Sequence, residues 1–237
     1  MEKIHTMEES EDYIQVKHKY NKIEEKVEDK YNAKTKLTYL AIKRILDILL
    51  SLIGMIVLLP IMIIISTIVK CDSKGPIFFR HKRIGQNGKI IYIYKFRTMC
   101  QNAEEMIKKF TPEQMKEFKT YYKLEKDPRI TKVGDFLRKS SLDELPQMLN
   151  IFRGDLSIVG PRPIVPKELE KYGKDQEKFL SVKPGLTGYW QANGRSNTTY
   201  EERIKMELYY VDNQSLWLDT KIFFKTFKAV FKKEGAK

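Results

Sequence analysis

Cysteine and histidine are scarce in this chain, which has two and three of them among 237 residues. Cys71 and Cys100 show no ligand-like spacing and are too few for the disulfide framework of a small secreted protein. Of the histidines, only His81 lies outside the polar N-terminal region. These absences argue against a zinc site and against a catalytic triad built on histidine. They favour a reduced body that faces the cytosol.

Other signatures are missing as well. The sequence has no internal repeat, no Asp-x-Asp metal motif of the kind usual in nucleotide-sugar glycosyltransferases, and no recognisable nucleic-acid-binding module. Its charge is nevertheless strongly basic, with 44 Lys and Arg against 31 Asp and Glu. Residues 1–44 hold ten of the basic and nine of the acidic residues, so the excess belongs to residues 45–237. We expect an anionic partner other than nucleic acid.

What the chain does have is a long apolar segment, residues 45–69. Ile, Leu and Val fill 17 of its 25 positions, and together they favour insertion into a bilayer by roughly 5–10 kcal/mol. Asp47 lies near the end of the segment, where a charge costs less. A cleavable signal is excluded because a charged region precedes the segment and no small-residue cleavage site follows it. A buried soluble helix of this length would usually carry a polar face.

Whether this segment crosses the bilayer is a separate question. As a straight helix it would reach about 37 Å, which is enough to cross the roughly 30 Å hydrocarbon core. Pro60, past its middle, removes a helical hydrogen bond and bends the axis. Both flanks are also basic, whereas a spanning helix normally has one basic flank. These features favour a re-entrant helix that breaks at Leu59–Pro60 and leaves on the side it entered, with a spanning helix as the alternative.

The chain therefore divides into a polar charged arm at residues 1–41, a re-entrant membrane helix at 42–70 and a small cytosolic body at 71–237. The expected fold class is α+β. Asn87-Gly88 lies between alternating segments and predicts a β-hairpin with strands at 77–84 and 89–97.

Amphipathic stripes follow the hairpin. Residues 102–125 read as two short helices, with Thr111 and Gln114 forming a capping box and Pro112 in the first turn. A similar stripe of apolar residues surrounded by lysines closes the chain: Phe223, Phe224, Phe227, Val230 and Phe231. Such helices could lie in the lipid headgroup layer, or they could simply pack on the core of the body.

Asp143 and Glu144 are the centre of the candidate chemistry. The run Ser141-Leu142-Asp143-Glu144 matches a capping box, in which the acidic residues would merely complement a helix N-terminus. Pro146 complicates that interpretation because it would disturb the first turn of a helix capped by Ser141. Alternatively, the two carboxylates flank one divalent cation or divide the roles of nucleophile and of metal or proton handler. From the residues alone both interpretations stand.

Basic residues near this pair are candidates for binding phosphate. Arg138 lies five residues before Asp143, and Arg162 lies between two prolines that restrict its backbone. Lys95 and Arg97 are two apart on the second predicted strand and share a face. They could clamp a diphosphate, or they could lie on a solvated edge.

The last cluster is residues 183–196. Pro184-Gly185 fits a type II turn. Aromatic, amide and guanidinium groups follow it and could recognise a base or a sugar, or could belong to an ordinary packed loop. They are Tyr189, Trp190, Gln191, Asn193 and Arg195.

Taken together, the motifs resemble the bacterial sugar transferase family. These are monotopic phosphoglycosyl transferases that begin the assembly of exopolysaccharide, capsule, O-antigen or glycoprotein glycans. The resemblance rests on the proline-containing apolar segment, KFRTM at 95–99, SLDELPQ at 141–147, GDLSIVGPRP at 154–163 and KPGLTGYWQANGR at 183–195. It spans about residues 42–232 in consistent order, so that only the arm falls outside it.

The resemblance implies an enzyme at the cytoplasmic face of the bacterial inner membrane, with residues 71–237 as its catalytic domain. It would transfer a sugar-1-phosphate from a UDP-sugar to undecaprenyl phosphate, releasing UMP. Asp143 would be the nucleophile that forms a covalent phosphosugar intermediate, and Glu144 would help with Mg²⁺ or with protons. Arg138 and Arg162 would contact phosphates, and Lys95 is a further candidate for that role.

One position departs from the family pattern. The re-entrant helix of the family bends at a Ser-Pro pair, whereas this chain has Leu59–Pro60, and Ser51 is too far away to substitute. The identity of the sugar is not indicated, and a homodimer stays open. The rival interpretation is a non-catalytic, membrane-anchored scaffold of glycan assembly, which would hold if Asp143 and Glu144 only cap a helix.

Overall fold

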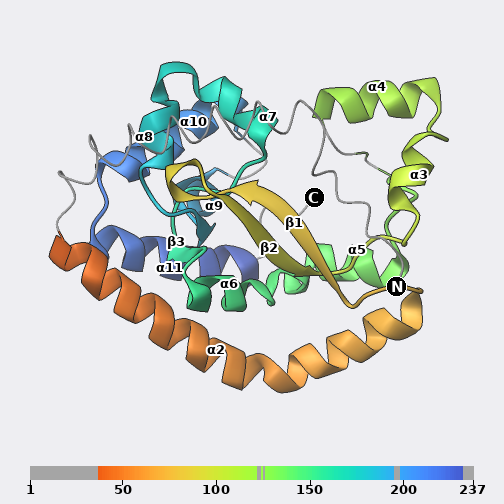
Figure 1. Ribbon diagram of the computed structural model, residues 1–237, viewed down its shortest axis with the longest axis horizontal. Coiled ribbons are helices and arrows are strands. Elements are labelled where there is room, and N and C mark those ends of the chain that lie inside the picture. The colour runs from red at the N-terminus through yellow and green to blue at the C-terminus, as the bar shows by residue number, and fades with distance from the viewer. Residues whose placement is uncertain (1–36, 122–123, 125, 195–197, 232–237) are drawn as a thin grey trace.

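The computed structural model describes residues 37–121, 124, 126–194 and 198–231. Its fold class is α+β, as predicted, with helices around two small sheets (Figure 1). The elements run in the order α2 (Leu37–Asp72), β1 (Phe78–Ile84), η2 (Gln86–Gly88), β2 (Ile90–Phe96), α3 (Ala103–Ile107), α4 (Pro112–Tyr121), α5 (Lys132–Lys139), η3 (Leu142–Glu144), α6 (Gln147–Arg153), β3 (Ser157–Val159), α7 (Pro166–Leu169), η4 (Glu170–Asp175), α8 (Gln176–Leu180), β4 (Gly185–Thr187), α9 (Tyr189–Asn193), α10 (Tyr200–Asp212) and α11 (Leu216–Phe231), where η marks a 3₁₀ helix. The predicted arm lies outside the described residues as far as residue 36.

The apolar segment forms α2, a single helix of 36 residues that continues through Pro60. The break predicted at Leu59–Pro60 is therefore absent from the helix, which instead bows beneath the body with both ends turned towards it (Figure 1). By length and composition α2 could cross a membrane. The re-entrant topology itself stays a prediction.

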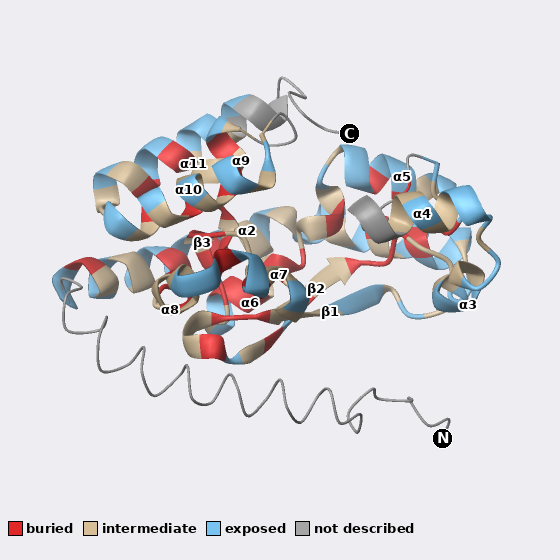
Figure 2. Cartoon of the chain, turned by 90° about the horizontal axis from the view of Figure 1, so that it is seen from above, coloured by how far each residue is buried: buried red, intermediate tan, exposed pale blue. Residues whose placement is uncertain are grey.

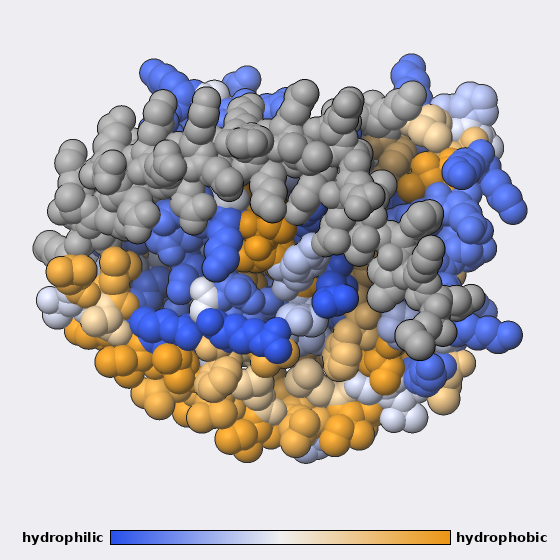
Figure 3. Space-filling model, viewed as in Figure 1, coloured by the Kyte–Doolittle hydropathy of each residue, from blue (hydrophilic) through white to orange (hydrophobic). Residues whose placement is uncertain are grey.

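One stripe of α2 faces the body, and most of the remaining helix surface is exposed. The helix packs against α5, α6 and β3, and its buried residues recur at helical spacing: Tyr39, Asp47, Ser51, Ile65 and Val69. Only 11% of its most apolar stretch is buried. The remaining leucine and isoleucine side chains form an apolar edge along the bottom of the molecule (Figure 3). Uncovered apolar surface of this extent marks a site for a membrane or another partner.

The predicted β-hairpin is confirmed. Strands β1 and β2 pair antiparallel from Phe78↔Phe96 to Ile84↔Ile90. At the tip, Asn87 and Gly88 have φ values of 56° and 80°, which is the left-handed backbone that Asn-Gly adopts readily in tight hairpins.

A second, parallel sheet joins two of the motifs. Strand β3 pairs with β4 through Ser157↔Gly185 and Val159↔Thr187. The type II turn predicted at Pro184-Gly185 is wrong, because Gly185 begins β4 and does not have the positive φ that such a turn requires. Glycine is needed at position 185 because the backbone of Gly160 lies so close that a β-carbon there would overlap it. The pairing brings the loop that carries Arg162 close to α9.

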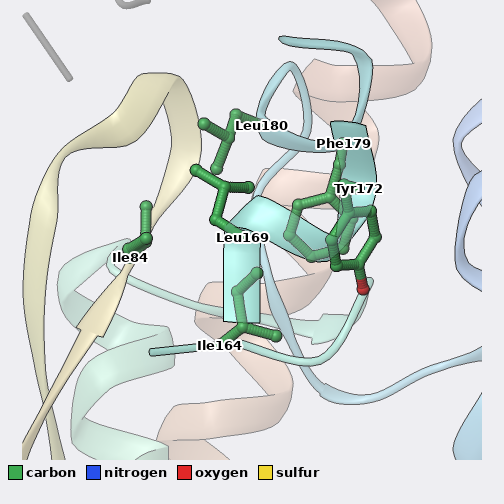
Figure 4. Close-up of a cluster of buried hydrophobic side chains, with 6 residues drawn as sticks. All are labelled: Ile84, Ile164, Leu169, Tyr172, Phe179 and Leu180. Atoms are coloured by element: carbon green, nitrogen blue, oxygen red, sulfur yellow. The ribbon is translucent and has the colours of Figure 1, made fainter. Parts of the chain in front are cut away.

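The core is divided into several clusters. One lies under the hairpin tip, where the tip contacts the helices that follow the Arg162 loop (Figure 4); its members are Ile84, Ile164, Leu169, Tyr172, Phe179 and Leu180. Another joins α2 to β2 and α5 through Ile65, Val69, Phe96 and Leu137. Figure 2 shows buried residues around β3 and on the inner faces of the helices, whereas β1 is mostly exposed or half-buried. The second half of α2 thus contributes Ile65 and Val69 to the core.

The amphipathic helices have different settings. The two predicted helices are α3 and α4, and Thr111 and Gln114 make both bonds of the capping box, at 3.2 and 3.0 Å. Their apolar stripe closes over Arg129, whose guanidinium lies 5.2 and 4.9 Å from the rings of Phe110 and Phe118. Helix α4 lies on the far side of the body from α2 (Figure 1). The described part of this stripe is therefore half-buried around Arg129 and lies away from α2.

On α11, Ile222 is buried, whereas Trp217 and Phe224 are 76% and 66% exposed. Phe224 thus lies outside the buried stripe, on an outer face that also carries Lys221 and Lys228. This face combines aromatic and basic side chains, as interfacial helices do. Phe223 is half-buried against a core cluster. The remaining predicted members of the stripe, Phe227, Val230 and Phe231, have side chains outside what the structure describes.

Candidate active site

Asp143 and Glu144 lie in η3, a single 3₁₀ turn between α5 and α6. Ser141, just before it, has a φ of 57° and its side chain makes no capping hydrogen bond. The capping-box interpretation is therefore wrong. Pro146 explains why, since it has no N–H to offer within a helix and the regular helix α6 starts only after it, at Gln147. The two carboxylates are left without a capping role.

Both carboxylates converge on one cation, the ammonium group of Lys95 on β2. Lys95 Nζ lies 2.6 Å from Glu144 Oε1 and 3.7 Å from Asp143 Oδ2. The side chain of Asp143 is only 10% exposed, while that of Glu144 is 29% exposed. Three residues from two elements thus form a compact charged group at the edge of the hairpin.

The surroundings push the pKa values of the two carboxyls apart. Burial raises the pKa of Asp143, and the charge of Lys95 offsets this only in part. Burial also acts against ionisation of Glu144, but the charges of Lys95 and Arg162 and hydrogen bonds from Lys95 and Gln147 leave its pKa below the usual range. Two neighbouring carboxylates with opposite shifts are typical of sites that divide two chemical roles.

Two arginines predicted to bind phosphate flank this group. Arg138 Nε donates to Thr98 Oγ1 at 2.8 Å, and the guanidinium is close enough to Asp143 for each charge to act on the other. The backbone N–H of Arg162 donates to both oxygens of Glu207, at 3.2 Å each, while its guanidinium lies 6.0 Å from the ring of Trp190. In the described parts of the chain, neither guanidinium has a carboxylate within ion-pair distance. An anionic ligand would supply the missing partner.

Arg97 does not join the site. Its side chain is buried and donates to the carbonyl oxygens of Val69, Ser73 and Pro76. The predicted phosphate clamp of Lys95 and Arg97 is wrong in its second half, because the end of α2 takes up the Arg97 guanidinium. This arginine instead fastens α2 to β2.

The predicted recognition residues on α9 are only partly explained by the structure. Asn193 is exposed and held in place, since its Nδ2 donates to the carbonyl oxygen of Tyr189 at 2.6 Å and its Oδ1 accepts from Lys225 at 2.5 Å. Gln191 is half-buried on the same short helix, and Arg195 lies outside the described residues. A role for these residues in recognising the substrate stays a prediction.

Four residues that were not predicted to belong to the site lie around it. His81 and Arg83 lie on β1, and Arg203 and Glu207 lie on α10. Arg203 stacks 4.5 Å from the ring of Trp190, and its Nε lies 3.8 Å from Oε1 of the fully buried Glu207. Little in the sequence indicates the Arg203–Glu207 pair, because an arginine and a glutamate four apart in a helix usually form a surface ion pair.

The donor set fits a magnesium ion. Asp143 and Glu144 already direct an oxygen towards the same ammonium group, so the two carboxylates can serve one cation. In the described part of the chain there is no group of three or more acidic, histidine or cysteine side chains that could hold a metal. Mg²⁺ commonly binds through one or two carboxylates and takes its other ligands from substrate phosphates and water.

Comparison with known proteins agrees with these motifs. A family model described as bacterial sugar transferase matches residues 38–233. The chain is 45% identical over 198 residues to the undecaprenyl-phosphate galactose phosphotransferase of Salmonella typhimurium, and 45% identical over 197 residues to the exopolysaccharide production protein ExoY of Sinorhizobium fredii. It is 40% identical over 204 residues to the UDP-glucose:undecaprenyl-phosphate glucose-1-phosphate transferase of Klebsiella pneumoniae.

These matches cover most of this chain but different shares of its relatives. They include 82% of the chain for the first two proteins and 81% for the third. The matched region makes up 87% of the Sinorhizobium protein but only 41% of the Salmonella and Klebsiella proteins. The family model, which matches residues 38–233, includes the whole site and all of α2 except Leu37.

Proposed function

Since this chain belongs to the bacterial sugar transferase family, we propose that it transfers a sugar-1-phosphate from a UDP-sugar to undecaprenyl phosphate. The products are undecaprenyl-diphosphate-sugar and UMP, and the reaction starts the assembly of exopolysaccharide, capsule or another surface glycan. The names of the relatives support the substrate class, because they include galactose and glucose-1-phosphate transfer to undecaprenyl phosphate.

The observation that carries the mechanism is the buried Asp143 beside a cluster of cations. An Asp143 carboxylate oxygen attacks the phosphorus that carries the sugar, and the bond from that phosphorus to the bridging oxygen breaks. UMP leaves with the electron pair, and the sugar phosphate stays on Asp143 as an acyl phosphate. A phosphate oxygen of undecaprenyl phosphate then attacks the same phosphorus and releases the Asp143 carboxylate.

The surrounding residues neutralise the phosphate charge. Arg138, next to Asp143, would hold the phosphate under attack, and Arg162 would hold the diphosphate on the Glu144 side. Lys95 would exchange a carboxylate for a phosphate oxygen when substrate enters. Asp143 and Glu144 would hold Mg²⁺, which supplies further neutralisation of phosphate charge when bound.

The location we propose is the cytoplasmic face of the bacterial cell membrane, with α2 embedded in it. Uncovered leucine and isoleucine side chains along α2 support the embedding. The face of α11 that carries Trp217, Phe224 and lysines would rest in the headgroup layer. The rival function, a non-catalytic scaffold, loses its main support because Asp143 and Glu144 do not cap a helix.

The decisive experiment is Asp143→Asn in the purified protein, given undecaprenyl phosphate and a panel of UDP-sugars. UMP release should fall by at least about 1,000-fold with the sugar that the wild type uses, because the amide cannot form the acyl phosphate. Asp135→Asn, on the exposed surface of α5, is the matched control and should keep wild-type activity. Near wild-type UMP release by Asp143→Asn would refute the assignment.

Loss of activity through misfolding can be separated from loss of the nucleophile. Burial raises the pKa of Asp143, so the charged carboxylate costs folding free energy at neutral pH that a neutral amide avoids. Asp143→Asn should therefore melt at or above the wild-type temperature. The same panel identifies the sugar.

A further inference from the structure

We propose that Arg83, held by His81, binds the phosphate of the departing nucleotide. The inference rests on the proposed function and deepens it, because it gives the site a direction. One end would serve the phosphate under attack, and the other end would serve the nucleoside monophosphate that leaves.

Arg83 is placed as a side chain that could bind an anion. It is half-buried on β1, and its Nη1 lies 2.6 Å from His81 Nε2. Among the described residues it has no carboxylate within ion-pair distance. A half-buried guanidinium without an anionic partner is costly unless a ligand supplies one.

The contact with Arg83 also fixes the state of His81. A guanidinium can only donate, so Nε2 of His81 accepts and its Nδ1 carries the hydrogen. Burial and the charges of Arg83, Lys95, Arg162 and Arg138 lower the pKa of His81 to about 3, which keeps the ring neutral. The pair therefore offers guanidinium N–H groups and one imidazole N–H.

The charges around Arg83 and its register on the hairpin indicate where it lies in the site. Burial together with the charges of Arg162 and Arg203 lowers its pKa to about 10, against the opposing effect of Glu168 and Glu144. Arg162 and Arg203 are also the two guanidinium groups next to the ring of Trp190. On the hairpin, Arg83 pairs with Ile91 near the tip, whereas Lys95 pairs with Phe79 at the other end. Arg83 thus belongs to the end of the site at the hairpin tip, whereas Arg138 belongs to the end that contains Asp143.

The two ends differ in their distance from the membrane helix. Arg138 lies on α5, which packs against α2. Arg83 lies next to Ile84, at the hairpin tip that packs on Leu169 and Leu180 of α7 and α8 (Figures 1 and 4). A lipid phosphate would arrive from the side of α2, so the end with Arg83 is left for the soluble substrate.

The chemistry of the first step needs a cation at that end. When Asp143 forms its bond to the sugar-bearing phosphorus, the bridging oxygen leaves with the electron pair, and the phosphate of UMP gains a negative charge. Arg83 would stabilise that charge through its N–H groups, without any transfer of a proton.

The test compares Arg83→Gln with Arg80→Gln, which changes an exposed arginine of the same strand. Arg83→Gln should weaken UMP binding, measured by calorimetry, by about 10–100-fold and should raise KM for the UDP-sugar by a similar factor. KM for undecaprenyl phosphate should stay unchanged, and Arg80→Gln should match the wild type. Arg83→Lys, which keeps the charge, should recover part of the UMP affinity.

Each outcome bears on the inference. Wild-type UMP affinity in a folded Arg83→Gln protein would overturn it, and so would a rise in KM for undecaprenyl phosphate alone. If Arg83→Gln does not fold, the same comparison is made with Arg83→Lys, whose UMP affinity should still fall below that of the wild type. Failure of the proposed function is recognised separately, because Asp143→Asn would then still release UMP.

Discussion

At the scale of single residues, the site depends on the different treatment of two adjacent carboxyls. Asp143 is more deeply buried than Glu144, and only Glu144 lies in direct hydrogen-bond contact with Lys95. The pKa of Asp143 is therefore raised while that of Glu144 is lowered. Once it is ionised, the more basic carboxylate makes the stronger nucleophile.

This difference predicts the pH dependence of the reaction. Asp143 must be ionised to attack, so kcat/KM for UMP release should fall on the acid side as Asp143 takes up a proton, at a pH above that of an ordinary aspartate. Lys95→Met removes a charge that lowers this pKa, so the acid limb should move to higher pH. Glu144→Gln removes a charge that raises it, so the limb should move to lower pH. The measurement is the pH profile of kcat/KM.

The two variants should move the midpoint of the acid limb in opposite directions. Both variants will also be slower, because both residues serve the site, but a lower rate does not move the midpoint of the limb. Movement of both midpoints in the same direction, or of neither, would show that Asp143 is not the titrating group.

The sequence was a good guide to some site residues and a poor guide to others. Asp143 and Glu144 stand in a distinctive motif, and Lys95 is on the strand that the Asn-Gly turn predicts. Lys95 and Arg97 look equivalent in the sequence, yet β2 ends at Phe96 and Arg97 turns to the carbonyl oxygens at the end of α2. That choice depends on tertiary contacts, which alternation along a strand cannot reveal.

At the scale of elements, polar bonds fasten the apolar helix α2 to the body. Near its start, Tyr39 and Lys43 donate to Asp219 of α11, at 2.9 and 2.5 Å. One turn later, Asp47 Oδ1 accepts from the hydroxyl of Ser157 at 3.1 Å and from the N–H of Ile158 at 2.9 Å. The side of α2 that faces the body is thus partly polar, although the helix as a whole is apolar.

These bonds predict an unusual response at Asp47. Asp47→Leu makes α2 more apolar, but it leaves the Ser157 hydroxyl and the Ile158 N–H without their acceptor in a buried place. We expect a loss of roughly 2–5 kcal/mol and a melting temperature about 4–20 °C lower in detergent. Asp47→Asn keeps an acceptor oxygen and should lose much less.

The matched control is Ile56→Leu, on the exposed face of the same helix, which should leave the melting temperature unchanged. If Asp47→Leu melts at or above the wild-type temperature, the hydrogen bonds of Asp47 do not hold α2 on β3.

Asp47 also shows where prediction of the elements stops. The sequence places Asp47 near a membrane boundary, where a charge is tolerated. In the structure, hydrogen bonds from residues 110 and 111 positions away stabilise its carboxylate instead. Predictions from short-range sequence patterns were more accurate, since the Asn-Gly hairpin and the Thr111 capping box are both present. Pro184-Gly185 misled because closeness to Gly160, and not turn geometry, demands the glycine.

At the scale of the whole molecule, α2 is attached to one body at both ends. Its start is tied to α11 through Asp219, and its end is tied to β2 through Arg97. A straight helix of 36 residues would be about 54 Å long, well beyond the roughly 30 Å hydrocarbon core. To cross the bilayer, α2 would have to break the bonds at one end and strand their polar groups. The bowed helix can instead enter the apolar layer with its middle and keep both ends with the body (Figure 1).

Both flanks of α2 should therefore be reached from the same side of the membrane. In a Cys71→Ser, Cys100→Ser background, single cysteines at Leu37 and Lys74, both exposed, should react with an impermeant maleimide in inverted inner-membrane vesicles and stay unlabelled in intact spheroplasts. Ile56→Cys is exposed on the protein but expected to face lipid, so it should react on neither side until detergent is added. Labelling of Leu37→Cys and Lys74→Cys from opposite sides would mean that α2 spans the bilayer and that the bonds at one of its ends are broken in the membrane.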